Sequence, residues 1–463
     1  MQKQKPIVLV LPLLLLPCLS PPSVVHAQTA PAQVVAVRPP AAALVTETAA
    51  KTSKVPQAIF DYVQREEPVY EWKIVSAHES DAGQTIVLRM KSQTWHDIVW
   101  EHQMVICEPK LVRHPNHAIL FVNGGSQHKL DQPPRDVGQF MAIATLSGGV
   151  VASVYQVPNQ PLFDQRYEDD LISETWLRYL KTQDATWPLL FPMAKSAVKA
   201  MDTVQAVAKS KLQRDIKGFV ITGASKRGWT SWLTPVVDQR VKGTAPMVID
   251  TLNFRKQIRH QHDSWGRFSE QIADYTRKGL VKLENENIRE RTLREMMDPW
   301  TYRERLTLPK LIVNGSNDPY WCVDAINNYW SDLQGPKLTL QLPNAGHGLK
   351  NGREKVVATI AHFFEFVAED KKLPRLTWNY ADDSHALTVT SQPPARSAQV
   401  WLATSADGDF RDDAFRSVEL PLNNGGGSLT LDLPANQKAA FFAEMTWGVG
   451  PARWSLSSTV WRR

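Results

Sequence analysis

The sequence predicts an α/β protein in which helices wrap a parallel sheet and a smaller all-β domain follows. Short, almost wholly apolar runs recur between residues 118 and 342, and strands covered on both faces require such runs. Stretches with helical periodicity separate these runs, as in a parallel sheet with crossover helices. Beyond residue 373 only short alternating segments divided by turns remain, which is typical of a small β-sandwich. The chain of 463 residues, 43% of them hydrophobic, is long enough for these cores.

The N-terminus has the composition of an export signal. Lys3 and Lys5 precede an apolar run at residues 7–16, and the small residue Ala27 ends the segment. The run is too short to cross a bilayer of ~30 Å as a helix. We therefore expect a signal peptide at residues 1–27 and an exported protein, periplasmic or secreted, without a stable membrane anchor. Residues 28–56, rich in Ala, Pro, Val and Thr, predict a linker.

Residues 57–372 contain the elements of the predicted α/β domain. Alternation at residues 86–90 and 98–100 predicts a hairpin that opens the sheet. Buried strands are expected at residues 118–122, 150–155, 218–222, 245–249 and 311–313, and a strand with alternating apolar residues at 338–342. Helices are expected at residues 170–180, 193–208, 228–237, 323–333 and 354–368. The charged, strand-free segment 254–305 is expected to form a cap over a site at the sheet's edge.

The C-terminal part, residues 373–463, predicts a β-sandwich. Its strands are expected at residues 386–390, 399–403, 429–433, 439–445 and 454–460.

Charge and cysteine content limit the classes of partner. The 53 Lys and Arg exceed the 47 Asp and Glu by 6 and are scattered, whereas nucleic-acid binding needs a concentrated basic stripe. Beyond the signal peptide, Cys107 and Cys322 are expected as buried thiols or, in an oxidising compartment, as a disulfide. They lack the spacing of a zinc site, so we expect no metal and no cofactor.

Ser225 stands where a buried strand ends and a helix begins. Gly223 and Gly228 flank it in the segment Gly-Ala-Ser-Lys-Arg-Gly, and small neighbours let strand and helix approach at a tight turn. This is the context of a nucleophile elbow, although the spacing G-x-S-x-x-G differs from the common G-x-S-x-G. The alternative interpretation is a serine that only caps a helix.

Two later strand-end loops supply an acid and a base in the order Ser, Asp, His. His347 is expected to take the proton of Ser225 and return it to the leaving group, while Asp318 stabilises the imidazolium. Asp250 also ends a strand and is the competing acid, but Asp318 has the spacing to His347 that is usual for this architecture.

Backbone N–H groups for an oxyanion hole are expected from Gly124 and Gly125, which follow a buried strand, and from Lys226, the residue after the nucleophile. Glu168 and Asp169 begin a helix, where carboxylates complement the helix dipole. The alternative is that one of them binds a cationic group of the substrate.

Several segments together resemble the PhoPQ-activated pathogenicity-related proteins. They are residues 223–229 (Gly-Ala-Ser-Lys-Arg-Gly-Trp), 187–188, 192–195, 200–202, 298–299 with Tyr302, and 308–315. The resemblance covers roughly residues 60–350 and implies an exported α/β-hydrolase with the triad Ser225, Asp318 and His347. The family's name implies a link to bacterial envelope defence or virulence, and some relatives are likened to dipeptidyl peptidases.

The predicted function is therefore a serine hydrolase that acts on an ester or peptide bond. A second resemblance, to the G-C-S-R-x-G elbow of glucuronoyl esterases, offers a carbohydrate esterase as an alternative in which the Lys226 side chain assists the oxyanion. A third interpretation is a non-catalytic binding protein on a hydrolase scaffold, against which the complete triad argues.

Overall fold

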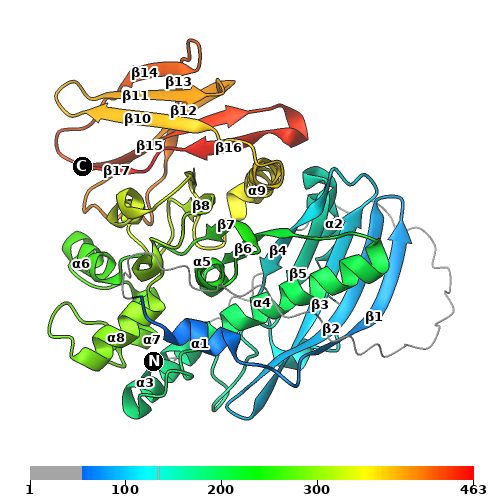
Figure 1. The fold of residues 1–463 in the computed structure, drawn as a ribbon. Helices are drawn as coiled ribbons and strands as arrows, with labels where there is room; N and C mark the ends of the chain where they lie inside the picture. The colour runs from blue at the N-terminus through cyan, green and yellow to red at the C-terminus, as the bar shows by residue number, and fades with distance from the viewer. Residues whose placement is uncertain (1–54, 133, 135) are drawn as a thin grey trace, which may run out of the picture.

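A nine-stranded mixed sheet forms the centre of the protein, and the computed structural model describes residues 55–132, 134 and 136–463 (Figure 1). The predicted signal peptide and nearly all of the predicted linker lie outside these residues. The strand order is β1-β2-β3-β5-β4-β6-β7-β8-β9. Three antiparallel strands open the sheet, β1 (Glu71–Ser80), β2 (Gly83–Trp95) and β3 (Ile98–Pro109). The parallel strands are β4 (His114–Val122), β5 (Gly149–Val154), β6 (Gly218–Ala224), β7 (Val241–Met247), β8 (Lys310–Gly315) and β9 (Lys337–Leu342).

Helices cover both faces of this sheet, which explains the continuous apolar runs. In β5 the side chains of Val150 and Ala152 enter one core, and Val151 between them enters the other. The first core includes α1 (Ala58–Gln64), α4 (Leu190–Val207) and α5 (Lys226–Val237). The second includes α2 (Val137–Ser147) and α9 (Arg353–Ala368). The layers and strand order are those of an α/β-hydrolase fold.

The segment between β7 and β8 forms a helical cap. It comprises α6 (Phe254–Trp265), η3 (Glu270–Ile272), α7 (Ala273–Thr276), α8 (Ile288–Met297) and η4 (Pro299–Tyr302), and it packs against α3 (Glu168–Thr182) (Figure 1). Asp298 joins both ends of the cap, because its carboxylate accepts the N–H groups of Phe254 at 2.8 Å and Trp300 at 2.9 Å. The cap is thereby held as a closed unit.

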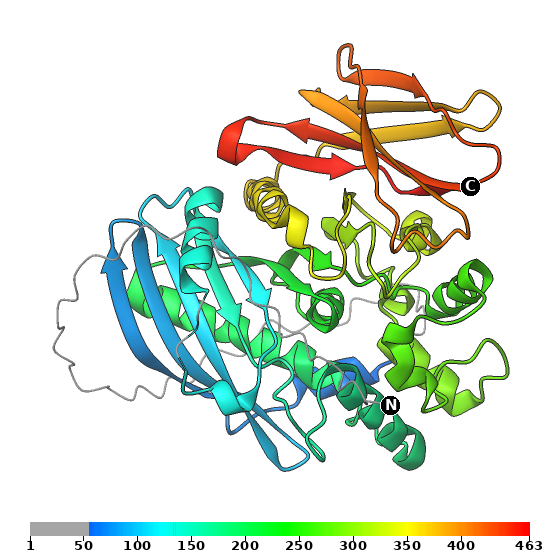
Figure 2. The same cartoon turned by 180° about the vertical axis from the view of Figure 1, so that it is seen from behind.

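The C-terminal part consists of two antiparallel sheets. One contains β10 (Arg375–Ala381), β11 (Ala386–Gln392) and β14 (Gly426–Thr430). The other contains β13 (Arg416–Leu420), β12 (Ser397–Ser405), β15 (Lys438–Trp447) and β16 (Trp454–Ser457), with β17 (Trp461–Arg462) paired to β15. Figure 2 shows this sandwich resting on the hydrolase part beside α9. Its core is continuous with the second core of the hydrolase part.

The helix predicted at residues 323–333 is wrong. The segment forms two 3₁₀ turns, η5 (Ala325–Asn328) and η6 (Trp330–Asp332). Asn327 donates to the carbonyl of Val460 at 2.7 Å, and Asn328 donates to Gln257 at 3.0 Å. Asparagine has a low helix propensity, and these tertiary hydrogen bonds favour turns over a regular helix.

Several other elements were not predicted, and one predicted strand is shorter than expected. The unpredicted elements are α1, β1, α2, β10, β13 and β17, and of the strand expected at residues 454–460 only residues 454–457 form a strand, β16.

Cys107 and Cys322 are both buried, free thiols. Of the two possibilities raised by the sequence, buried thiols or a disulfide, the structure has the thiols. Burial raises the pKa of Cys107 to about 11 and that of Cys322 to about 12.

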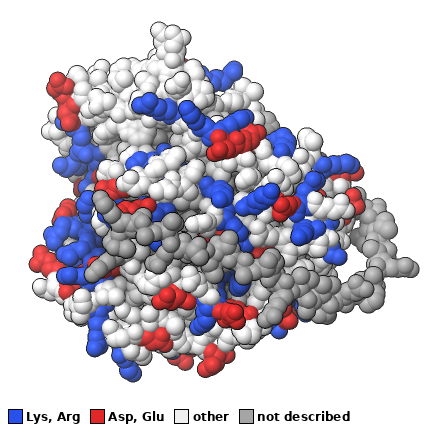
Figure 3. All heavy atoms as spheres, in the orientation of Figure 1, with Lys and Arg blue, Asp and Glu red and all other residues white. Residues whose placement is uncertain are grey.

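The surface carries both signs of charge. On the face in Figure 3, Lys and Arg side chains are interspersed with Asp and Glu. No helix in the described part of the chain is both long enough and apolar enough to span a bilayer.

Candidate active site

Ser225 occupies a strained turn between β6 and α5. Its φ of 58° and ψ of −124° are rare for a residue with a side chain, and its N–H donates to the Met247 carbonyl at 2.9 Å. A Cβ on Gly223 would lie 2.7 Å from the Arg227 carbonyl oxygen, and one on Gly228 would lie 2.7 Å from Ile249. The two glycines of the G-x-S-x-x-G segment therefore permit the close approach of strand and helix that the turn needs.

Asp318 and His347 contact each other from the loops that follow β8 and β9. The Nδ1 atom of His347 lies 2.8 Å from Oδ2 of Asp318, and the other carboxylate oxygen accepts the Tyr320 N–H at 2.9 Å. The Tyr320 ring lies against the imidazole at 4.3 Å between centroids. Among the described residues, the buried Nε2 of His347 has no hydrogen-bond partner. The imidazole is thus oriented on one side and free on the other.

Ser225 and His347 line the same pocket. Within the described chain no hydrogen bond joins the serine hydroxyl to the imidazole. Such bonds are often long in unliganded sites and tighten when substrate binds.

The competing acid, Asp250, has other partners. Its carboxylate accepts a hydrogen bond from Asn314 at 2.9 Å and one from the Tyr329 hydroxyl. Burial raises the pKa of Asp250 to about 7. Of the two candidate acids, Asp318 is the one bonded to His347.

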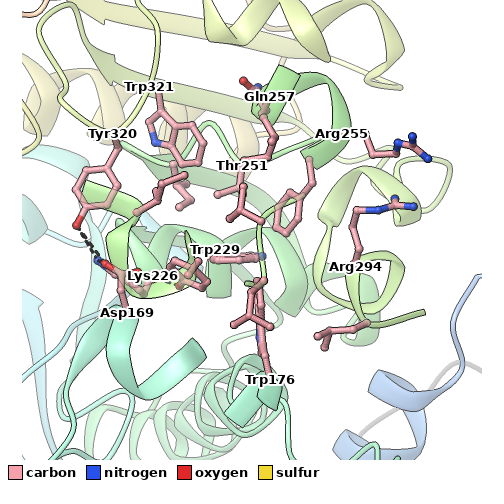
Figure 4. Close-up of a pocket in the computed structure, with 18 of the residues that line it drawn as sticks. Asp169, Trp176, Lys226, Trp229, Thr251, Arg255, Gln257, Arg294, Tyr320 and Trp321 are labelled. Atoms are coloured by element: carbon pink, nitrogen blue, oxygen red, sulfur yellow. Dashed lines mark hydrogen bonds and ion pairs between the residues drawn. The ribbon is translucent and has the colours of Figure 1, made fainter. Parts of the chain in front are cut away.

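Asp169 lies in the first turn of α3 and is surrounded by donors at the edge of the pocket (Figure 4). Its Oδ2 lies 2.6 Å from Nζ of Lys226 and accepts the Tyr320 hydroxyl at 3.1 Å, and its Oδ1 accepts the Tyr275 hydroxyl at 2.9 Å. Burial alone would lower the pKa of Lys226, but the Asp169 carboxylate holds it above its usual range. The ammonium of Lys226 is therefore engaged by a carboxylate of its own chain.

Glu168 forms a neighbouring pair with Arg227. Two hydrogen bonds of 2.7 and 2.8 Å join the guanidinium to the carboxylate, and Gln160 donates to the same carboxylate at 2.6 Å. Burial by itself would raise the pKa of Glu168, but Arg227 lowers it to about 2. Sequence reasoning missed both pairs, although the adjacent acids at 168–169 and adjacent bases at 226–227 were the available signal.

The predicted oxyanion-hole residues lie beside the elbow. β4 pairs with β6 up to Val122 and Gly223, and Gly124 follows in the next turn. A Cβ on Gly124 would lie 2.4 Å from the Arg227 guanidinium, and Gly125 has a φ of 136°. Among the described residues, the N–H of Lys226 donates to no backbone carbonyl outside its helix. The structure therefore brings the glycine loop and the start of α5 together.

Comparison with solved structures finds several hydrolases of low similarity. Acetyl xylan esterase 1 from Thermoanaerobacterium sp. is 15% identical, with a TM-score of 0.46 and coverage of 68% of this chain and 95% of that chain. The acylaminoacyl peptidase of Pyrococcus horikoshii is 12% identical, with a TM-score of 0.41 and coverage of 65% and 49%. The glucuronoyl esterase from Solibacter usitatus is 12% identical, with a TM-score of 0.38 and coverage of 68% and 92%.

Sequence comparison identifies closer relatives. The autocrine proliferation repressor protein A of Dictyostelium discoideum is 31% identical over 421 residues, which are 83% of this chain and 84% of that protein. Residues 59–411 match the family described as PhoPQ-activated pathogenicity-related protein. The chain belongs to that family.

Proposed function

We propose that the protein is a serine hydrolase in which Ser225 is the nucleophile, His347 the general base and Asp318 the orienting acid. One observation supports this most directly. The Nδ1 side of His347 is bonded to Asp318 at 2.8 Å, while its buried Nε2 has no partner among the described residues, and His347 lines the same pocket as Ser225. An imidazole held this way has one nitrogen available to accept a proton.

In the proposed reaction, the Ser225 oxygen attacks the carbonyl carbon of the substrate and its proton moves to Nε2 of His347. The N–H groups of Lys226 and of the Gly124–Gly125 loop stabilise the resulting oxyanion. The intermediate then expels the leaving group, which receives the proton from Nε2, and an acyl-enzyme remains. Water attacks this ester with the same proton transfers, which releases the acid and restores Ser225.

A fluorophosphonate probe tests the nucleophile, because it labels activated serines. The wild-type protein should be labelled and Ser225→Ala should not. Ser331→Ala, a change of an exposed serine outside the pocket, is the matched control and should keep full labelling. Labelling that persists in Ser225→Ala would contradict the assignment, and a folded wild type that never labels would favour the non-catalytic binding protein.

The ion pairs of Glu168 and Asp169 favour an ester substrate over a peptide that is bound by its free N-terminus. A dipeptidyl or aminopeptidase needs a carboxylate for the substrate's ammonium group, but Glu168 and Asp169 are paired with Arg227 and Lys226. A panel of short acyl esters, glucuronate esters and dipeptide anilides separates the alternatives. We expect acyl esters to be cleaved fastest. Anilide cleavage that disappears on N-acetylation of the substrate and in Glu168→Gln would instead establish the peptidase.

The carbohydrate esterase alternative is tested by a variant of Lys226. If the Lys226 side chain assists the oxyanion of a glucuronate ester, Lys226→Ala lowers kcat at unchanged KM, since such a contact acts in the transition state. The ion pair with Asp169 at 2.6 Å favours a positioning role for Lys226 instead.

Export is also a proposal, and it rests on the pattern of residues 1–27. Fractionation of producing cells should find the protein outside the cytoplasm, with a mature N-terminus near residue 28. A cytoplasmic protein that retains these residues would contradict it. The link to envelope defence or virulence stays a prediction from the family's name.

A further inference from the structure

The pocket extends from Ser225 along the underside of the cap, and its walls are mostly apolar. Trp176 of α3 and Trp229 of α5 lie on one side, as Figure 4 shows. Aliphatic and aromatic side chains from the β7–α6 connection, α6, the segment following α7 and α8 complete the lining. They include Ile249, Phe254, Ile258, Leu280, Val281 and Leu293.

Charged residues mark the end of the pocket away from Ser225. Arg255 and Arg294 lie together there, opposite the end that holds Asp169 and Lys226 (Figure 4). Arg294 is bonded to Glu286 at 2.9 Å, so this rim is polar where the walls are apolar. The apolar lining is therefore bounded by polar groups at both ends.

We propose that this pocket binds an extended apolar chain attached to the scissile ester, and that the cap sets the length of chain that fits. The inference rests on the proposed serine chemistry and names its substrate class. Two arguments support it. Binding in an apolar pocket is favourable when the ligand buries apolar surface. The carboxylates of Asp169 and Glu168 are already paired with Lys226 and Arg227 of the protein.

Two ester series test which side of the ester carries the chain. One lengthens the acyl group in p-nitrophenyl esters from acetate to palmitate, and the other lengthens the alcohol in alkyl acetates. In the series that fits, kcat/KM should rise by up to about fourfold per added methylene. The rise should stop once the chain reaches the charged rim.

Leu293→Trp tests the part played by the cap, because Leu293 lines the pocket from α8 and is 4% exposed. A larger side chain there should reduce the ratio of long-chain to acetate kcat/KM by tenfold or more. Ile288→Trp is the control on the same helix, because Ile288 is 72% exposed and lies outside the pocket. It should leave the ratio of long-chain to acetate kcat/KM unchanged. Ile258→Trp, from α6, is the second blocking variant if Leu293→Trp does not fold.

Calorimetric titration of Ser225→Ala with sodium decanoate tests the pocket independently of catalysis. Binding that is lost on adding Leu293→Trp or Ile258→Trp supports the inference, even if no ester is hydrolysed and the proposed chemistry fails. Equal kcat/KM along both series together with no decanoate binding would overturn the inference, while loss of acetate hydrolysis in Ser225→Ala would still support the serine mechanism.

Discussion

The cap and the C-terminal sandwich both reach the candidate site, but they reach different parts of it. The cap lines the pocket with side chains of α6 and α8. The sandwich contributes no residue to that lining within the described chain. Its segment 406–415 instead contacts the two loops that carry Asp318 and His347.

Two asparagines make these contacts. Asn317 donates to the carbonyls of Phe410, Arg411 and Asp413 at 2.9, 3.1 and 2.8 Å. Asn344 donates to the Phe415 carbonyl at 2.9 Å and accepts its N–H at 2.7 Å. If the proposed function holds, substrate selection and the positioning of acid and base fall to separate regions of the molecule. Changes in the cap should alter which chain fits, and changes at the sandwich contact should lower turnover for every substrate.

The largest expected effect comes from removing the acid itself. Asp318→Asn should lower kcat by up to ~10⁴-fold, by analogy with other triad aspartates, because the amide cannot hold the imidazole in the required tautomer. Asp250→Asn is the matched control at the adjacent strand end and should keep most of the activity, since Asp250 bonds Asn314 and Tyr329. Equal losses in the two folded variants, measured with a short acyl ester, would leave neither acid assigned.

The second effect concerns stability at the point where the chain enters the cap. Because burial raises the pKa of Asp250 to about 7, folded protein keeps this proton where the unfolded chain has lost it. The contribution of Asp250 to the stability of the folded protein is complete below about pH 4. It is lost as pH rises to about 7, which lowers the free energy of unfolding by up to ~4 kcal/mol. Urea unfolding measured from pH 4.5 to 7.5 should show that, as pH rises, the free energy of unfolding of the wild type falls relative to that of Asp250→Asn. A constant difference would contradict this.

Cutting the contact with the sandwich should have a smaller effect on catalysis. Asn344→Ala removes both hydrogen bonds to Phe415, and the looser His347 loop should lower kcat by ~10- to 100-fold. KM and the preference among chain lengths should not change, because the pocket is untouched. Asn423→Ala, at an exposed turn of the sandwich, is the control. A changed chain-length preference in Asn344→Ala would break the division between the two regions.

The smallest effect is expected where the two regions meet at the surface. Arg411 of the sandwich bonds Glu270 of the cap at 2.9 Å and lies over the Trp265 ring at 4.2 Å. Glu270 is 60% exposed, so Glu270→Gln, which removes this ion pair and leaves Arg411 in place, should destabilise the protein by no more than ~1 kcal/mol. Thermal unfolding at low and high salt checks this, and Glu419→Gln, at an exposed position of the sandwich, is the control. A loss of several kcal/mol would mean that cap and sandwich are coupled more strongly than their exposed contact suggests.

Much of the fold was accessible from local sequence, since the signals were local. The continuous apolar runs at β5 and β8 predicted strands buried on both faces, and all six residues of each are buried. Residues 323–333 misled prediction because the bonds of Asn327 and Asn328 to distant residues replace a helix. No local pattern reports such partners.

For the site, the serine turn was predictable from sequence alone, because Gly223 and Gly228 leave room for strand and helix to approach beside Ser225. The sequence by itself also determined the order of acid and base along the chain. The contact of Asp318 with His347, the pairing of Lys226 with Asp169 and the contacts of segment 406–415 with both loops became visible only in the folded structure. Hydrogen bonds and ion pairs act over a few ångströms in space, so residues far apart in sequence become partners only once the fold has brought their elements together.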